Sequence, residues 1–177
     1  MRIGLLHIAV VALLGWWILR ACDWHRHPGY EVDREVILSA GMSFDGKGQR
    51  IQDGDTLTVR GDGLEFVIVR LSAIDAPERG QAFGNVAKKE LTAKCLNRSI
   101  QVVSVGKDGR GRTVGDVSCD GIQMQEYMVR NGFAWVSDKY AQNYPQLYSL
   151  QQEAMQRQIG LWADENPMRP DIFRKRK

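Results

Sequence analysis

Apolar and polar residues in the middle of the chain alternate in short runs, as they do in half-buried β-strands. Residues 55–60 follow this alternation, and residues 66–71 form a β-branched run suited to a strand that is buried on both faces. The glycine-rich residues 61–63 between them tolerate a tight turn. The pattern therefore predicts a β-hairpin, within a series of short strands that starts at about Arg34.

Apolar residues follow a helical period over residues 81–96, where every fourth position would face a core: Phe83, Ala87, Leu91 and Cys95. Two more helices are predicted, at residues 124–130 and 145–158. Gly132 and Gly160 would end them, because glycine readily adopts the left-handed conformation found at helix C-termini.

Residues 100–105 and 112–118 return to the strand pattern on either side of a glycine-rich turn at residues 106–111. Several strands with a helix inserted between them predict an α+β fold. A small closed β-barrel of the oligonucleotide-binding (OB) type, with helices packed on it, fits this order of elements.

A long apolar stretch, residues 3–19, precedes the predicted strands and is flanked by arginines. It is at the lower limit for spanning a bilayer and rather long for the apolar part of a secretory signal. Trp16 and Trp17 suit a membrane interface. We expect residues 1–21 to form a signal-anchor helix or a cleaved signal peptide, and the missing small-residue cleavage site favours the anchor. The domain would then be extracytoplasmic, either membrane-anchored or secreted.

Hydrophobic residues make up 44% and charged residues 25% of the chain, as expected for one globular domain. The net charge of +3 is too small for binding nucleic acid through bulk charge, so basic groups would have to be placed locally. The dense basic run at residues 174–177 is interpreted as the solvated end of a C-terminal tail, residues 164–177. Residues 22–47 are interpreted as a linker and a lead-in strand.

The three histidines all precede residue 28, so the predicted domain has none. This excludes Ser-His-Asp and Cys-His hydrolases, whose nucleophile needs a histidine. The cysteines show no zinc-ligand spacing. Cys95 and Cys119 could pair in an oxidising compartment, or Cys95 could be an unpaired thiol buried on its helix. Because the predicted domain has no histidine, catalysis would use carboxylates, arginine, lysine, tyrosine or a metal ion.

Acidic residues cluster at two places in the predicted domain. Asp53 and Asp55 flank a glycine where a strand begins, and Asp75 and Glu78 flank a proline just after another strand. Taken separately, the first cluster is typical of a turn, and the second is typical of the loop that follows a strand. Gathered in one place, these carboxylates would repel each other without a cation, and oxygen ligands favour calcium or magnesium.

Two arginines accompany the acids: Arg70 inside an apolar strand and Arg112 after the glycine-rich turn. An arginine in an apolar strand is costly unless it reaches a partner or opens onto a cleft. Phosphodiester cleavage adds negative charge to the phosphate oxygens, which a divalent ion and bidentate arginines stabilise. A further carboxylate can deprotonate the attacking water.

The order of these motifs resembles that of the staphylococcal nuclease (thermonuclease) family. The matching stretches are Asp-Gly-Asp-Thr at 53–56, Arg-Leu-x-x-Ile-Asp-x-Pro-Glu at 70–78, Asp-x-x-Gly-Arg at 108–112, Val-Arg-x-Gly-x-Ala at 129–134 and Gly-Leu-Trp at 160–162. The resemblance covers the predicted domain, residues 48–163. It implies a five-stranded OB-fold barrel with three packed helices and a calcium-dependent nuclease.

The resemblance also implies a metal site. Asp55 and Asp75 would bind one Ca²⁺ ion together with the backbone carbonyl of Ala76. Asp53 and Thr56 would contact these ligands without binding the ion themselves.

For catalysis, the resemblance implies that Glu78 deprotonates or positions the attacking water, while Arg70 and Arg112 hold the scissile phosphate. Arg110 replaces a tyrosine that is frequent in the family before Gly-Arg, so it is a possible phosphate contact in place of a stacking surface. Trp135 and Tyr140 are candidates for stacking on bases, although Trp135 would equally suit a core.

We therefore expect in-line hydrolysis of DNA, RNA or both, with single or frayed strands preferred, 3′-phosphate products and a monomeric enzyme. The alternative is an OB-fold module that is tethered to the membrane and binds nucleic acid without cleaving it. Such a module should have lost part of the catalytic set, whereas this chain retains all of it: Asp55, Arg70, Asp75, Glu78 and Arg112.

Overall fold

The computed structural model of the chain describes residues 37–61, 63 and 65–176. The predicted signal anchor or signal peptide at residues 1–21, and most of the predicted linker, lie outside the described residues. None of the helices within the described ranges has both the length and the apolar character that crossing a bilayer would require.

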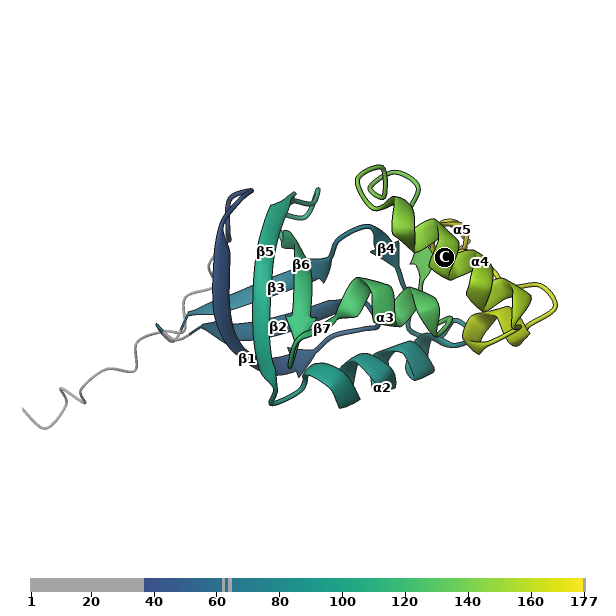
Figure 1. Cartoon of the computed structure of the whole chain (residues 1–177), viewed down its shortest axis with the longest axis horizontal. Helices are drawn as coiled ribbons and strands as arrows, with labels where there is room; N and C mark the ends of the chain where they lie inside the picture. Colours follow the sequence, from purple (N-terminus) through teal and green to yellow (C-terminus); the bar gives the residue numbers. More distant parts are fainter. Residues whose placement is uncertain (1–36, 62, 64, 177) are drawn as a thin grey trace, which may run out of the picture. The chain divides into compact units, whose positions relative to one another are not determined.

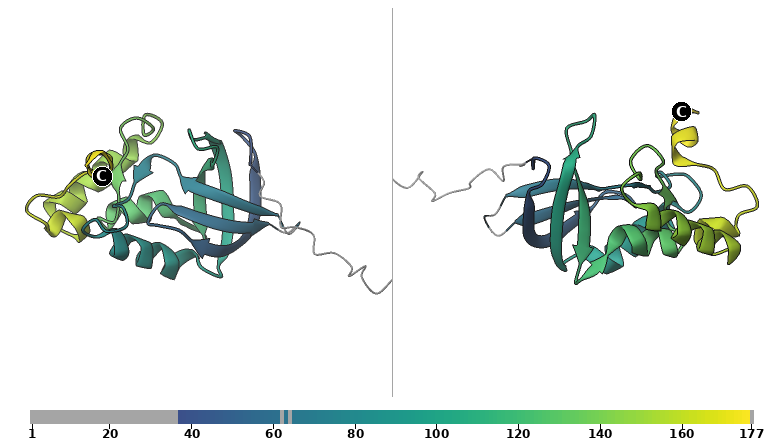
Figure 2. Two further views of the ribbon diagram at one scale, coloured as in Figure 1. Left: turned by 180° about the vertical axis from the view of Figure 1, so that it is seen from behind. Right: turned by 45° about the horizontal axis from the view of Figure 1, so that its top comes forward.

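Long strands in the described part close into a mixed β-barrel (Figures 1 and 2). Their order is β3-β2-β1-β5-β6 with antiparallel neighbours, and a parallel pairing of β3 with β6 closes the barrel. This confirms the five-stranded barrel, which has the form of an OB fold. The strands are β1 (Ser43–Ile51), β2 (Thr56–Gly61), β3 (Phe66–Leu71), β5 (Ser99–Lys107) and β6 (Thr113–Cys119).

The barrel interior is lined by every second residue of the strands. In β3, Val67, Val69 and Leu71 are buried, whereas the residues between them, including Arg70, are only half-buried. The expectation that this strand is buried on both faces is therefore wrong, because a closed barrel has one interior face and the side chains of a strand alternate. β1 starts before the predicted domain boundary at residue 48, so residues 43–47 are also part of the barrel.

The three expected helices are present: α2 (Gly84–Cys95) and α3 (Met124–Arg130) pack on the barrel, and α4 (Pro145–Gln156) packs on α3. α2 lies below the barrel in Figure 1 and buries Ala87, Leu91 and Cys95. Cys95 forms a disulfide with Cys119 at the end of β6, with a Cα–Cα distance of 5.3 Å. Of the two alternatives for these cysteines, the structure therefore shows the paired one.

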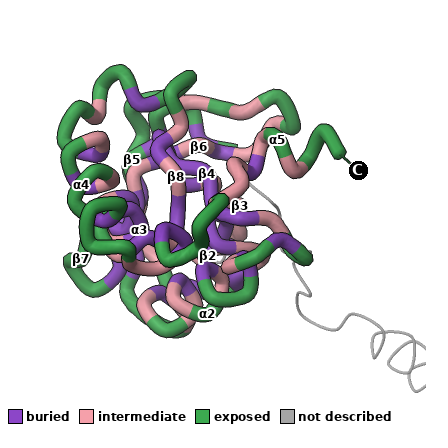
Figure 3. Tube along the Cα trace, turned by 90° about the vertical axis from the view of Figure 1, so that its right-hand side faces the viewer, coloured by how far each residue is buried: buried purple, intermediate pink, exposed green. Residues whose placement is uncertain are grey.

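Short elements complete the described part: β4 (Ile74–Asp75), β7 (Ile122–Gln123), β8 (Trp135–Val136), the 3₁₀ helix η2 (Gly160–Ala163) and α5 (Pro170–Lys175). β4 pairs with β8 outside the barrel, and Figure 3 shows buried segments gathered around this pair. The tail differs from its interpretation as a solvated end, because α5 is helical and Arg174 within it contacts carboxylates near the barrel.

Candidate active site

The structure brings Asp55, Arg70 and Asp75 together at one end of the barrel. Asp55 directly precedes β2, and Arg70 in β3 pairs with Thr56, the first residue of β2. Asp75 lies in β4, which its pairing with β8 holds in place. The Arg70 Nη2 atom lies 3.1 Å from Asp55 Oδ2 and 2.9 Å from Asp75 Oδ1. The two predicted ligand carboxylates therefore converge on a single nitrogen atom.

Backbone contacts fix this arrangement. The amide of Leu71 donates to the Asp55 carbonyl at 2.8 Å, and the amide of Ala76 donates to Asp55 Oδ2 at 3.2 Å. At Gly54, an added Cβ would lie 2.7 Å from the Cβ atoms of both Ala76 and Ala87. Only glycine therefore lets the Asp-Gly-Asp turn pack this closely against the Ala76 segment and α2.

Arg70 itself is held by more than the two carboxylates. Its Nη1 atom donates to the carbonyl oxygens of Leu71, at 3.2 Å, and Ile74, at 3.0 Å. The side chain is only 17% exposed, and these contacts offset the cost of keeping a charge half-buried. The guanidinium is thus already oriented towards the acids.

Asp53 and Thr56 both contact Asp55. The Asp55 amide donates to Asp53 Oδ1 at 3.1 Å, and the Thr56 hydroxyl donates to Asp55 Oδ1 at 2.8 Å. The Arg112 Nη1 atom donates in turn to Thr56 Oγ1 at 3.3 Å. Arg112 is therefore linked to the acidic cluster through a single hydroxyl group.

Arg112 is held in place by Asp108, a residue of the motif to which sequence reasoning gave no role. Nε and Nη2 of Arg112 both lie 2.7 Å from Asp108 Oδ2. Asp108 Oδ1 accepts the backbone amides of Arg110 and Arg112 at 2.9 and 3.0 Å. Partial burial would raise the pKa of Asp108, but the hydrogen bonds from Arg112 and these amides outweigh it and lower the pKa.

Glu78 is positioned by the turn that precedes α2. Its amide donates to Gln81 Oε1 at 3.0 Å, and the Gln81 amide donates to the Glu78 carbonyl at 2.9 Å. The Glu78 carboxylate is linked to Asp75 through Arg174, whose Nη1 lies 2.7 Å from Glu78 Oε1 and 3.1 Å from Asp75 Oδ1. Arg174 was not predicted as a site residue from the sequence. It lies in a run of basic residues, and nothing in that run indicates an acidic partner almost a hundred residues away.

The oxygen-only donor set at Asp55 and Asp75 fits a hard divalent cation such as Ca²⁺. Burial raises the pKa of Asp55 above its ordinary value, and the opposing attraction of Arg70 does not cancel that effect. A bound cation would favour the ionised carboxylate. Among the described residues, no three His, Cys, Asp or Glu side chains form a possible metal cluster. The predicted ligand set has only two acidic side chains, with the Ala76 carbonyl as the third donor.

The candidate nucleic-acid contacts lie in separate places. Tyr140 is 54% exposed and lines a groove of about 290 Å³ with Lys139, Ser72 and Val114. Ser72 directly follows β3, and Val114 lies opposite Arg70 in the β3–β6 pairing, so part of the groove lining comes from the barrel end that carries Arg70. Arg110 is exposed in the turn before β6.

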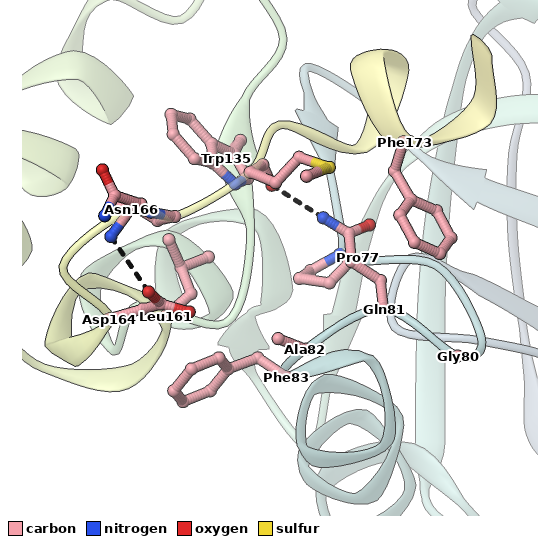
Figure 4. Close-up of a pocket in the computed structure, with 12 residues that line it drawn as sticks. Pro77, Gly80, Gln81, Ala82, Phe83, Trp135, Leu161, Asp164, Asn166 and Phe173 are labelled. Carbon is pink, nitrogen blue, oxygen red and sulfur yellow. Dashed lines mark hydrogen bonds between the residues drawn. The ribbon is translucent and has the colours of Figure 1, made fainter. Parts of the chain in front are cut away.

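Trp135 lies in a different environment. Its ring is 4.3 Å from that of Trp162 in a T-shaped contact, and the Arg169 guanidinium lies 5.4 Å from its centroid. It lines a second pocket, of about 180 Å³, together with Phe83, Leu161 and Phe173 (Figure 4). Trp135 and Tyr140 therefore line different pockets.

Tyr144, which also lines the Tyr140 groove, is held by a partly buried polar network. Its hydroxyl donates to Asp116 Oδ1 at 2.7 Å, and Ser72 donates to the same oxygen. Burial, supported by the nearby Asp116 carboxylate, raises the pKa of Tyr144 to about 12. The phenol therefore stays protonated at neutral pH and cannot serve as a base.

Comparison with known proteins places the chain among nucleases. Residues 68–164 match the family described as staphylococcal nuclease homologues. A protein of Haemophilus influenzae named "uncharacterized endonuclease" is 38% identical over 128 residues, covering 72% of this chain and 71% of that protein. One of the same name from Escherichia coli O157:H7 is 38% identical over 133 residues, covering 75% and 86%. The micrococcal nuclease of Shigella flexneri is 36% identical over 150 residues, covering 79% and 86%. The family match and these relatives agree with the order of the motifs, and the chain belongs to the staphylococcal nuclease family.

Proposed function

We propose that the chain is a calcium-dependent nuclease that hydrolyses phosphodiester bonds of DNA, RNA or both. One observation carries the proposal: a continuous series of ion pairs and hydrogen bonds links every residue of the expected catalytic set. It runs from Arg112 through Thr56 to Asp55, then through Arg70 to Asp75, and through Arg174 to Glu78. These acids and guanidinium groups come from five separate stretches of the chain. Stability of the fold does not require them to come together, because partly buried ion pairs contribute little to it.

In the proposed mechanism, Asp55, Asp75 and the Ala76 carbonyl would hold a Ca²⁺ ion. When bound, this ion would supply a Lewis acid that neutralises charge on the phosphate. Arg70 and Arg112 would donate to the phosphate oxygens and stabilise the extra negative charge that develops as water adds to phosphorus. Arg70 is already held by carboxylates and carbonyls, and Arg112 by the Asp108 carboxylate and the Thr56 hydroxyl, so little reorganisation is needed.

Glu78 would accept a proton from the attacking water. Its side chain is 34% exposed, so water can reach it. A new bond then forms between phosphorus and the water oxygen, and the bond to the 5′ oxygen opposite it breaks. The products would be a 3′-phosphate and a 5′-hydroxyl, whose oxygen takes a proton from solvent.

The groove beside Tyr140 supports single or frayed strands as the preferred substrate. An exposed aromatic ring can stack on an unpaired base, whereas the bases of a duplex are covered by their neighbours. Lys139, with its ammonium group 5.1 Å from the Tyr140 ring centroid, and the exposed Arg110 add local positive charge for the phosphates.

A nuclease assay on the full-length protein in detergent tests the proposal. We expect cleavage of denatured DNA or RNA with added calcium, loss of cleavage with a chelator, and 3′-phosphate ends by end-group analysis. Glu78→Gln should retain the fold and lose most of the rate, while the control Glu165→Gln, an exposed residue outside the catalytic set, should not. Binding of single strands without cleavage under any metal would instead identify a binding module, and full activity in excess chelator would remove the metal from the mechanism.

We also propose that the domain acts outside the cytoplasm as a monomer, anchored to a membrane or exported by residues 1–21. The apolar residues 3–19 support this, and so does the Cys95–Cys119 disulfide, because such bonds persist in oxidising compartments. External protease should degrade the domain in cells whose inner membrane is intact. Protection until that membrane is broken would contradict the location.

A further inference from the structure

The guanidinium group of Arg174 lies over two carboxylates of the proposed active site. Its Nη2 atom is 2.7 Å from Asp75 Oδ2, and its Nη1 atom is 3.1 Å from Asp75 Oδ1 and 2.7 Å from Glu78 Oε1. Asp75 is buried and accepts from Arg70 on the same Oδ1. Both oxygens of a predicted metal ligand, and one oxygen of the predicted base, are therefore engaged by a residue from the C-terminal helix.

α5 is docked by specific contacts as well as by this ion pair. Just before the helix, the Met168 carbonyl accepts a hydrogen bond from Gln81 Nε2 at 2.7 Å, and Pro170 is buried. Arg169 reaches Asp138 at 3.2 Å and lies over Trp135. In Figure 4, Phe173 extends from α5 towards the segment of Pro77 and Gly80, on either side of Glu78. The helix is therefore held across the same turn that carries the predicted base.

The position of Arg174 conflicts with the chemistry proposed for its two partners. A guanidinium donating to both oxygens of Asp75 occupies the directions from which a cation would bind that carboxylate. An oxygen of Glu78 that already accepts a charge-assisted hydrogen bond is a weaker base for water. The contact is also easy to undo, because the Arg174 side chain is 39% exposed and α5 is a single helix of 6 residues.

We propose that α5 is an autoinhibitory strap, in which Arg174 competes with the divalent cation for Asp75 and with the attacking water for Glu78. The proposal rests on the proposed nuclease function. At low calcium the strap is closed and the carboxylates are paired with arginine. Calcium binding at Asp75 displaces Arg174 and frees Glu78, so that cation binding and exposure of the base occur together.

Direct calcium binding to the full-length protein, measured by titration calorimetry, tests the strap. Arg174→Gln should lower the calcium dissociation constant about tenfold, a change of about 1.4 kcal/mol. The matched control Arg176→Gln removes the same charge two residues away and should change the dissociation constant less than twofold. Arg174→Lys keeps the charge without the bidentate geometry and should fall between the wild type and Arg174→Gln.

Hydrogen exchange of the peptide covering residues 170–176 gives a readout that does not involve activity. In the wild type, calcium should accelerate exchange of the α5 amides as the strap opens, and circular dichroism should show that the variants remain folded. Equal calcium affinity in the wild type and Arg174→Gln, or exchange that calcium leaves unchanged, would overturn the strap. A loss of turnover in Arg174→Gln at saturating calcium would also overturn it, because Arg174 would then bind substrate.

The failure of the strap and the failure of the proposed function give different results. If the wild type binds calcium and cleaves nucleic acid but Arg174→Gln behaves like it, only the strap is wrong. If neither protein binds calcium or cleaves under any condition, the proposed function fails and the strap fails with it.

Discussion

At the scale of single residues, the site is built from charges that are held before any substrate arrives. Arg70 illustrates this, because its half-buried guanidinium contacts two carboxylates and two backbone carbonyls. A preorganised donor of this kind is useful to catalysis because it does not have to reorient when charge develops on the phosphate. The same reasoning identifies Asp108 as a positioning residue for Arg112.

We predict that Asp108→Asn lowers the free energy of unfolding at neutral pH and also lowers kcat/KM, because Arg112 loses its anchor. The native pKa of Asp108 lies below its ordinary value of 3.8, so the stabilisation by its carboxylate is complete above that pH. It is lost as the pH falls through the lowered native pKa. Urea unfolding between pH 3 and pH 7 should therefore show a difference from the wild type that shrinks towards the acidic end.

The control for this prediction is Asp120→Asn, since Asp120 lies on an exposed surface, where it pairs with Arg98 at 3.6 Å and accepts the Ser99 amide at 3.1 Å. It should leave kcat/KM unchanged. An Asp108→Asn protein with normal kcat/KM would show that Arg112 is oriented by Thr56 alone, or that its orientation does not limit the reaction.

Sequence reasoning identified most of this set because each residue belongs to a short local pattern. Asp108 and Arg112 are four residues apart, and Arg70 and Asp75 are five apart, so local spacing already constrains them. Arg174 is 99 residues from Asp75 and 96 from Glu78. No local pattern encodes that contact, which arises only when the barrel and the C-terminal segment are folded together.

At the scale of elements, the turn that carries Glu78 depends on how closely α2 approaches it. An added Cβ at Gly84, the first residue of α2, would overlap the carbonyl oxygen of Glu78. The same Cβ would lie 3.2 Å from the carbonyl oxygen of Pro77. The helix can therefore begin directly against the turn that bears the predicted base only because this position has no side chain.

We predict that Gly84→Ala lowers kcat by roughly tenfold to a hundredfold, because the Glu78 turn must move away and a displacement of about 1 Å suffices for such a loss. Steady-state kinetics and a thermal unfolding curve would separate this effect from global destabilisation. Gly109→Ala is the control, since a Cβ at Gly109 meets no atom within 4 Å. Equal kinetics in both variants would mean that the turn adapts without moving the carboxylate.

The Cys95–Cys119 disulfide joins the end of α2 to the end of β6 and closes a loop with a sequence separation of 24. Closing a loop of this length restricts the unfolded chain and is worth about 3 kcal/mol. Replacing both cysteines with alanine should lower the free energy of unfolding by about this amount in urea titrations. A reductant should destabilise the wild type and leave the stability of the double variant unchanged. If the reductant also destabilised the double variant, its effect would not come from this disulfide.

Elements were predictable from the sequence where a periodic pattern was long or clearly ended. The short helix at Met124–Arg130 was predicted within its observed bounds because Gly132 follows it, and the apolar stripe of α2 was also found. α5 was missed because six residues are too few for a periodic stripe and its composition is that of a charged tail. The two-faced burial expected for β3 failed because a continuous apolar run does not reveal a closed barrel.

At the scale of the whole molecule, closure of the barrel brings the site together. The parallel pairing of β3 with β6 places Arg70 opposite Val114, two residues beyond Arg112. The turn after β3 then carries Asp75 and Glu78 to the same end. Hydrophobic periodicity predicted the strands but not this pairing, which followed only from the resemblance to a family with a known arrangement.

Because the carboxylates of this site come from different segments, a bound cation should stabilise the whole fold. Asp55 precedes β2 and Asp75 follows β3, so an ion that binds both carboxylates joins segments that separate on unfolding. At about 100 times its dissociation constant, calcium should raise the free energy of unfolding by about 2.7 kcal/mol, and a chelator should reverse this. Thermal unfolding across a calcium series measures the effect.

Asp75→Asn should abolish this stabilisation, because it removes one of the two proposed acidic ligands, while the exposed Asp120→Asn should retain it. The strap adds a further requirement, since a cation that must displace Arg174 stabilises the wild type less than it would a protein without that competitor. The calcium series of Arg174→Gln should therefore reach its midpoint at lower calcium than that of the wild type. An undiminished response in Asp75→Asn would place the stabilising ion elsewhere on the molecule and separate it from the catalytic carboxylates.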